Sequence, residues 1–203
     1  MKLLYGTTNK AKLTTMEMAT KPLGIELISL NDLDGAIPKV EETGKTPLEN
    51  AAQKAKAYFE AFHMPVFSCD SGLYFDELSE EEQPGIHVRR VGDKVLTDEE
   101  MQTYYGGLAK AHGGQLTGRY RNAIYLILED GKEYSSMDIS LATEAFLLVP
   151  EAHKKLVPGF PLDSLSKDIA TGEYYYDLPE KEVSTSAMQE GFRKFFEKVL
   201  KDL

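Results

Sequence analysis

Three stretches of the chain have the spacing of amphipathic helices. The clearest start is Thr46-Pro47-Leu48-Glu49, where threonine suits the N-cap, proline the first turn, and glutamate completes a capping box. This helix is expected to run to about Phe62. A second capping box, Thr97 to Glu100, predicts a helix to about Ala111, and a third helix is expected from Ser186. The apolar positions expected to face the core are Leu48, Ala52, Ala55, Phe59 and Phe62 in the first helix and Phe192, Phe195, Phe196, Val199 and Leu200 in the last.

Short apolar runs between the helical stretches predict β-strands. A long hairpin is expected where Asp130-Gly131 separates two runs, Leu116 to Glu129 and Lys132 to Ser140. The segment from Asn31 to Thr43 is expected to be a polar loop. The other predicted strands are Lys2 to Gly6, Glu26 to Ser29, Val66 to Ser68, Leu73 to Phe75 and Thr143 to Val149.

The stretch from Val66 to Leu78 places a carboxylate at the end of a predicted buried strand. The strand is expected to end near Asp70, and Ser71-Gly72 to turn the chain into the next strand. A strand end holds a carboxylate rigidly, and a hard cation needs fixed oxygen ligands beside substrate phosphates. The alternative is an ordinary surface turn, because Asp, Ser and Gly are all common turn residues.

The N-terminal strand leads into a predicted phosphate-binding helix start. Thr7-Thr8-Asn9 connects the strand to a helical pattern from Lys10 to about Thr20. The free N–H groups of a helix start attract phosphate, and Lys12 would add a positive charge one turn further on. The alternative is that Asn9 is only an N-cap and Lys12 a solvated surface residue.

Two more groups of polar residues are candidates for the same site. Asn50 and Lys54 are four residues apart, so they share a helix face that could meet a ligand next to Glu41; a solvated pair is the alternative. Arg89 or Arg90 could reach phosphate, although adjacent arginines usually form a surface pair.

Composition indicates an ordinary globular protein. Of the 203 residues, 42% are hydrophobic and 28% charged, and the formal net charge of -10 argues against a nucleic-acid-coating role. The single cysteine, Cys69, fits a reducing cytosol. No apolar run has signal-peptide or transmembrane character, so we expect one compact cytosolic unit over residues 1–203 with no membrane partner.

Taken together, these motifs resemble the inosine triphosphate pyrophosphatase family. The matching segments cover roughly the first half of the chain, and their order and joint spacing are more specific than any one of them. They are Thr7-Thr-Asn-Lys-Ala-Lys12, Glu41-Glu-Thr-Gly44, Thr46-Pro-Leu-Glu-Asn-Ala51 with Lys54, and Asp70-Ser-Gly-Leu73 with Pro84-Gly85.

The resemblance implies a fold, a reaction and a site. The fold would be an elongated, two-lobed α/β structure around a long mixed sheet with flanking helices, usually a homodimer. The reaction would be Mg²⁺-dependent hydrolysis of nucleoside triphosphates, preferably inosine, xanthosine and deoxyinosine forms, to monophosphate and pyrophosphate. Asp70 would be the catalytic residue and, with Glu41, a metal ligand. The residues implied to bind substrate are Thr7, Thr8, Asn9, Lys12, Asn50, Lys54, Ser71, Gly72, Arg90 and Lys181.

The chain also departs from this family. Cys69 stands where the family has a first acid before Asp-Ser-Gly, and a thiol is a poor ligand for a hard cation. The Gly-Phe-Gly-Tyr-Asp-Pro stretch becomes Gly159-Phe-Pro-Leu-Asp-Ser164, and Thr185-Ser186-Ala187 replaces a late Ser-His-Arg that contacts the purine. Two alternatives therefore stay open: a nucleotide-binding or sensing protein with reduced or lost catalysis, and a protein in which the motifs are structural.

Overall fold

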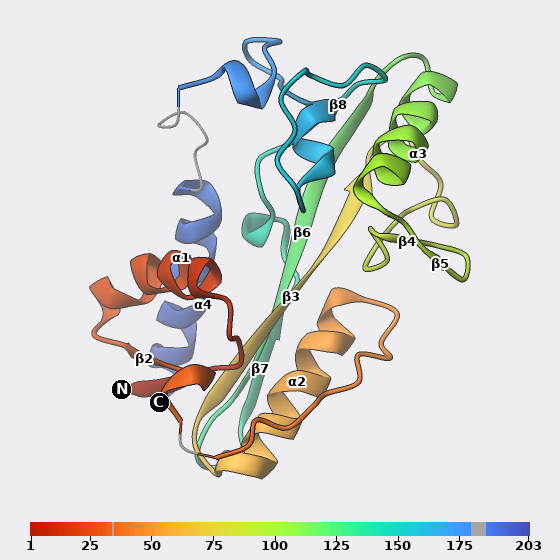
Figure 1. The fold of residues 1–203 in the computed structure, drawn as a ribbon. Helices are drawn as coiled ribbons and strands as arrows, with labels where there is room; N and C mark the ends of the chain where they lie inside the picture. Colours follow the sequence, from red (N-terminus) through yellow and green to blue (C-terminus); the bar gives the residue numbers. More distant parts are fainter. Residues whose placement is uncertain (34, 180–185) are drawn as a thin grey trace. The chain divides into compact units, whose positions relative to one another are not determined.

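The computed structural model describes residues 1–33, 35–179 and 186–203 (Figure 1). The chain divides into two compact units. Unit 1 comprises Met1–Ser71, Arg121–Ala142 and Thr185–Leu203, and unit 2 comprises Gly72–Tyr120 and Thr143–Ser184. Two long strands, β3 (Val66–Phe75) and β6 (Leu116–Ile127), each contribute residues to both units.

The sheet is mixed, with strand order β2-β1-β3-β6-β8-β9 and β7 paired to β6. In unit 1, β1 (Lys2–Tyr5) pairs in parallel with both β2 (Glu26–Ser29) and β3, with Tyr5 opposite Phe67. Strand β7 (Glu133–Ser136) returns antiparallel along β6, which confirms the predicted hairpin. The mixed α/β class, a long sheet flanked by helices, is confirmed.

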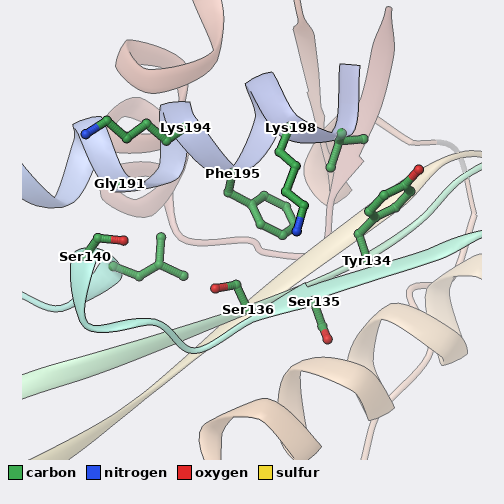
Figure 2. Close-up of a pocket in the computed structure, with 10 residues that line it drawn as sticks. Tyr134, Ser135, Ser136, Ser140, Gly191, Lys194, Phe195 and Lys198 are labelled. Atoms are coloured by element: carbon green, nitrogen blue, oxygen red, sulfur yellow. The ribbon is translucent and has the colours of Figure 1, made fainter. Parts of the chain in front are cut away.

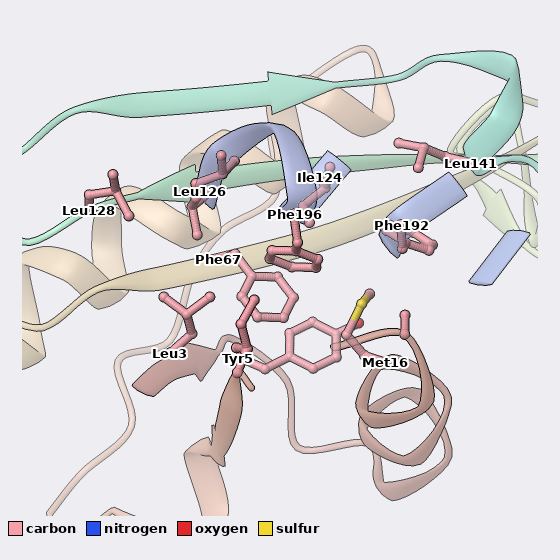
Figure 3. Close-up of a cluster of buried hydrophobic side chains, with 13 residues drawn as sticks. Leu3, Tyr5, Met16, Phe67, Ile124, Leu126, Leu128, Leu141, Phe192 and Phe196 are labelled. Carbon is pink, nitrogen blue, oxygen red and sulfur yellow. The ribbon is translucent and has the colours of Figure 1, made fainter. Parts of the chain in front are cut away.

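Helices cover both faces of the sheet in unit 1. Helices α1 (Lys10–Thr20) and α4 (Ser186–Lys201) pack on one face over a core that includes Tyr5, Phe67 and Phe196 (Figure 3). The Tyr5 and Phe67 rings stack 4.5 Å apart, and Phe196 meets Phe67 edge-on at 5.2 Å. Helix α2 (Pro47–Phe62) packs on the other face, over a core that contains Val66. Consecutive β3 residues therefore face different helices.

Unit 2 has its own core and its own helix. Helix α3 (Asp98–Ala111) starts with both halves of the predicted Thr97 capping box and packs over Leu73, Phe75 and Leu116. Strands β8 (Phe146–Leu148) and β9 (Ser166–Asp168) are antiparallel neighbours, and β4 (Arg90–Val91) forms a small hairpin with β5 (Lys94–Val95). Short 3₁₀ helices occupy Lys21–Leu23, Leu30–Asp32, Ile139–Leu141, Pro161–Leu165 and Tyr175–Asp177.

The turn expected at Asp70 is wrong. Residues Val66–Phe75 form one continuous strand, and Asp70-Ser71-Gly72 lies inside it. Two backbone hydrogen bonds, from Leu73 N–H to Gly85 O at 2.9 Å and from Gly85 N–H to Leu73 O at 3.0 Å, keep the later part extended. The local turn preference of Asp, Ser and Gly is outweighed by strand pairing with residues distant in sequence.

Two expectations about α2 also need correction. Its buried positions are Pro47, Asn50, Ala51, Ala55 and Tyr58, rather than a stripe through Leu48 and Ala52. The two alanines are fully buried, and their small side chains allow the helix to lie close to the sheet. Thr46 caps the helix as predicted, but the Glu49 carboxylate accepts from Lys45 N–H at 2.6 Å.

In the part of the chain that the structure describes, no helix combines the length and the apolar character needed to cross a membrane.

Candidate active site

Two side chains of α2 hold the Asp70 carboxylate on β3. Asn50 Nδ2 donates to Asp70 Oδ2 at 3.1 Å, and Lys54 Nζ donates to Asp70 Oδ1 at 3.1 Å. The Lys54 and Asp70 side chains are only 12% and 15% exposed, so water screens this ion pair weakly. Asn50 and Lys54 share the predicted helix face, and this face meets Asp70 rather than solvent.

Asn50 connects Asp70 to the loop before α2. Its Oδ1 accepts from Gly44 N–H at 2.9 Å while its Nδ2 donates to Asp70, and the residue is 3% exposed. A Cβ on Gly44 would lie 2.6 Å from Asn50 Oδ1, so this close approach requires glycine. Asn50, a predicted substrate-binding residue, therefore fixes the position of the Asp70 carboxylate.

Lys54 also joins a second acid to the cluster. Its Nζ lies 3.4 Å from Glu42 Oε2 as well as 3.1 Å from Asp70 Oδ1. Glu41, the predicted metal ligand, is exposed and forms no ion pair within residues 1–33, 35–179 and 186–203. The neighbour of the predicted acid is therefore the one that contacts Lys54. Sequence analysis missed Glu42, whose side chain is 43% exposed, because adjacent acids in a loop give no signal for which of them contacts Lys54.

On the opposite face of β3, unit 1 contains a largely apolar cavity of about 230 Å³. Cys69 and Ser71 line it from β3, Lys12 and Met16 from α1, and Met188 and Phe192 from α4. Burial raises the pKa of the Cys69 thiol to about 12, although a hydrogen bond from the Tyr5 hydroxyl and the Lys12 charge oppose the shift. The thiol is therefore neutral at physiological pH and is neither a nucleophile nor an anionic ligand there.

Asn122 on β6 organises this cavity and was missed by sequence analysis. Its Oδ1 accepts from Ser71 Oγ at 2.6 Å, and its Nδ2 donates to Leu141 O at 2.7 Å and contacts Met188 Sδ at 3.2 Å. The signal that could have found it is the one amide side chain of this strand, which directly precedes its apolar residues 123–127. The predicted substrate residue Ser71 thus already has a protein partner.

The loop after β1 is built as a helix cap. Asn9 Oδ1 accepts from Lys12 N–H at 3.2 Å, and Thr7 Oγ1 accepts from Asn9 N–H at 3.2 Å. Asn31 Nδ2 donates to Thr8 O at 3.1 Å and ties the loop to the segment after β2. Asn9 is therefore an N-cap, and this role is compatible with binding phosphate, because Thr8, Asn9 and Lys12 are all exposed at the start of α1.

Two other predicted substrate residues, Gly72 and Arg90, belong to unit 2. Gly72 is buried in unit 2, where a Cβ would come within 2.9 Å of the Gly85 backbone, so its glycine is explained by packing. Arg90 is exposed on the β4–β5 hairpin of unit 2; its neighbour Arg89 pairs with Asp98 at 2.7 Å. Lys181 lies outside the described residues.

The carboxylate oxygens of Asp70 and Glu42 suit a divalent metal ion whose remaining ligands come from substrate phosphates and water. No group of three His, Cys, Asp or Glu side chains within the described ranges could hold a metal ion by itself. Asp70 and Glu42 are nevertheless hard oxygen donors that converge on one cation, the Lys54 ammonium. Mg²⁺ usually needs only one or two carboxylates when substrate phosphates and water complete its shell.

A second cavity of about 230 Å³ lies between α4 and the β7 segment (Figure 2). Lys194 and Lys198 of α4 and three serines line it, with Phe195 between them. The described residues that line it include no acid, so it lacks a metal ligand or general base of the kind that Asp70 supplies. Asp70 therefore marks the stronger candidate site.

A comparison with protein-family models identifies the family of this chain. The sequence model described as the Ham1 family matches residues 3–140, and the chain belongs to this family.

Proteins named dITP/XTP pyrophosphatase are among its relatives, which confirms the resemblance seen in the sequence motifs. The one from Oceanobacillus iheyensis is 39% identical over 98 residues, which is 48% of this chain and 49% of that protein. The one from Geobacter sulfurreducens is 32% identical over 135 residues, or 66% of each chain. The chain thus spans about half the length of the first relative.

Solved structures share the fold over the whole chain. A HAM1 protein from Coxiella burnetii superposes with a TM-score of 0.73 at 21% identity, covering 100% of both chains. The Ham1 protein of Staphylococcus aureus gives a TM-score of 0.71 at 18% identity, covering 100% of this chain and 99% of the other.

Proposed function

We propose that this protein hydrolyses nucleoside triphosphates to nucleoside monophosphate and pyrophosphate. The observation that carries the proposal is the half-buried Asp70 carboxylate, fixed between Asn50 and Lys54. The printed names of the relatives, dITP/XTP pyrophosphatase, support the same reaction and suggest purine triphosphates, including non-standard ones, as substrates.

In this proposal the chain positions the phosphates and compensates their charge. The cap of α1, with Thr8 and Asn9, offers N–H groups to phosphate oxygens, and Lys12 adds a charge there. Lys54 lies on the other side of β3 and stabilises the departing pyrophosphate. The reacting water attacks the α-phosphorus, and the Asp70 carboxylate orients it or accepts its proton.

We further propose that the cofactor is Mg²⁺. Asp70 and Glu42 would hold it, with Glu41 as the ligand that the family resemblance implies. When bound, the ion neutralises phosphate charge and makes the phosphorus a better electrophile. Asn50 holds one oxygen of Asp70, so the carboxylate keeps its orientation when a metal ion binds.

The test is pyrophosphate release from a panel of purified nucleoside triphosphates, with and without Mg²⁺. We expect hydrolysis to release equal amounts of nucleoside monophosphate and pyrophosphate, and no orthophosphate from the γ-position. Binding of triphosphates without any turnover would instead support the alternative of a sensing protein. Absence of both binding and turnover would support the other alternative, in which the sequence motifs have only a structural role.

We also propose a cytosolic homodimer without a nucleic-acid or membrane partner. The net charge of -10 disfavours a polyanion partner, and the single cysteine suits a reducing compartment. Dimerisation is suggested by the family resemblance alone, and sedimentation velocity would measure it.

A further inference from the structure

Lys54 occupies the position of a cation between two acids. Its Nζ lies 3.1 Å from Asp70 Oδ1 and 3.4 Å from Glu42 Oε2. The side chain is 12% exposed, so the ammonium depends on these two oxygens for most of its compensation. The ammonium thus satisfies the same carboxylates that a divalent metal would need.

Asp70 is also held in place by contacts other than that with Lys54. Asn50 fixes the second oxygen of Asp70 and is itself tied to the Gly44 backbone. A free dication that approached Asp70 would therefore meet the Lys54 charge at close range, in a region that water screens weakly. Either the ammonium leaves or the metal is excluded.

We propose that Lys54 is a built-in counterion that closes the Glu42–Asp70 site to free divalent metal, and that a polyphosphate opens the site by drawing the ammonium to itself. Metal binding is then conditional on the anion, which prevents an ion from occupying the site without substrate. The identity of the anion as a nucleoside triphosphate rests on the proposed function; the exclusion of free metal does not.

The exclusion is tested with the metal alone. We would measure Mg²⁺ binding by calorimetry, and Mn²⁺ binding by electron paramagnetic resonance, for the native chain and for Lys54→Gln. The variant is expected to bind either ion roughly tenfold or more tightly, because removal of the ammonium leaves Asp70 and Glu42 uncompensated. Lys54→Arg keeps the positive charge, so its Glu42–Asp70 site should still exclude free divalent metal.

Lys56 provides a matched control on the same helix. It is 53% exposed and pairs with Glu133 at 3.7 Å, so Lys56→Gln also removes one positive charge from α2 but leaves the Asp70 cluster intact. Its metal affinity should equal that of the native chain. Equal gains in Lys56→Gln and Lys54→Gln would show a general effect of net charge and overturn the proposal.

If Lys54→Gln is less stable than the native chain, recovery of its stability by metal provides a second test of the counterion role. A half-buried Asp70 that has lost its cationic partner destabilises the variant, and metal that binds only the folded chain should restore stability. Mg²⁺ is therefore expected to raise the melting temperature of Lys54→Gln, or to refold it as followed by circular dichroism, whereas NaCl of equal ionic strength does not. No effect of Mg²⁺, or metal affinity no higher than in the native chain, would refute the counterion role. Neither readout involves turnover, so failure of the proposed hydrolysis would be seen separately, in the pyrophosphate assay.

Discussion

Cys69 and Asp70 are consecutive residues of β3, yet their side chains lie on opposite faces of the sheet. Asp70 contacts Asn50 and Lys54 of α2, whereas Cys69 lines the cavity beside α1 and α4. The alternation follows from the continuous strand, in which successive side chains point to opposite faces. Position 69 therefore does not contribute to the group of side chains around Asp70, and a thiol there removes no ligand from that group.

This geometry predicts the outcome of Cys69→Asp. The sequence alone suggests that the change would restore a missing acid and raise Mg²⁺ affinity or rate. The structure instead places the new carboxylate in a largely apolar cavity, which Lys12 also lines. We expect a loss of about 1–3 kcal/mol in the free energy of unfolding, measured in urea, and no gain in Mg²⁺ affinity. Cys69→Ser is the size-matched control, and tighter Mg²⁺ binding by a folded Cys69→Asp protein would contradict this assignment of faces.

Asp70→Asn should abolish metal-dependent hydrolysis. The change removes a charge but little volume, and Lys54 keeps its contact with Glu42. Transition-state stabilisation should fall by at least about 3 kcal/mol, measured as kcat/KM for triphosphate hydrolysis. Asp76→Asn, which alters an exposed ion pair with Arg119 in unit 2, should leave activity unchanged. Near-native turnover by a folded Asp70→Asn protein would show that Asp70 is not the catalytic residue.

The Cys69 thiol should be slow to alkylate while the chain is folded. Because burial raises its pKa to about 12, little thiolate forms at pH 8, whereas an unfolded cysteine is partly ionised there. Iodoacetamide should therefore modify the native protein at least about tenfold more slowly than the protein in urea, even allowing for the greater nucleophilicity of a more basic thiolate. The raised pKa also contributes stability that is present below the ordinary thiol pKa and is lost as the pH rises towards 12. Equal labelling rates in the two states would show that the thiol is not shielded.

The helix starts of this chain can be predicted from local sequence signals. The candidate site cannot, because it depends on contacts between residues distant in the sequence. Thr46 and Thr97 cap their helices as predicted, because a capping residue needs only partners three residues away. The continuity of β3 through Asp70 depends on strand neighbours, which no window around Asp-Ser-Gly contains. Likewise, Glu42 rather than Glu41 contacts Lys54 because of how the loop folds back onto α2.

The N-terminal cap predicts a phosphate-specific role for Lys12. Lys12→Ala should weaken binding of a nucleoside triphosphate by about 1.5–3 kcal/mol, the usual value of a charge-assisted contact. Binding of the corresponding nucleoside should hardly change, since it carries no phosphate. Calorimetry on both ligands measures the difference, and Lys21→Ala, on the 3₁₀ helix after α1, is the control. Equal losses for both ligands would indicate a structural role for Lys12.

The last prediction concerns the purine. Selection by a base edge needs fixed polar groups, since an unpaired buried donor or acceptor is what rejects the wrong ligand. The family resemblance implies that Thr185-Ser186-Ala187 stands in place of a late Ser-His-Arg, and the side chains of Ser186 and Ala187 are too short to reach the same edge. We therefore expect hydrolysis with weak or altered preference for inosine and xanthosine triphosphates over the standard purines, measured as kcat/KM across the panel. A preference of about a hundredfold or more for inosine over adenosine triphosphate would mean that another group reads the purine 6-position.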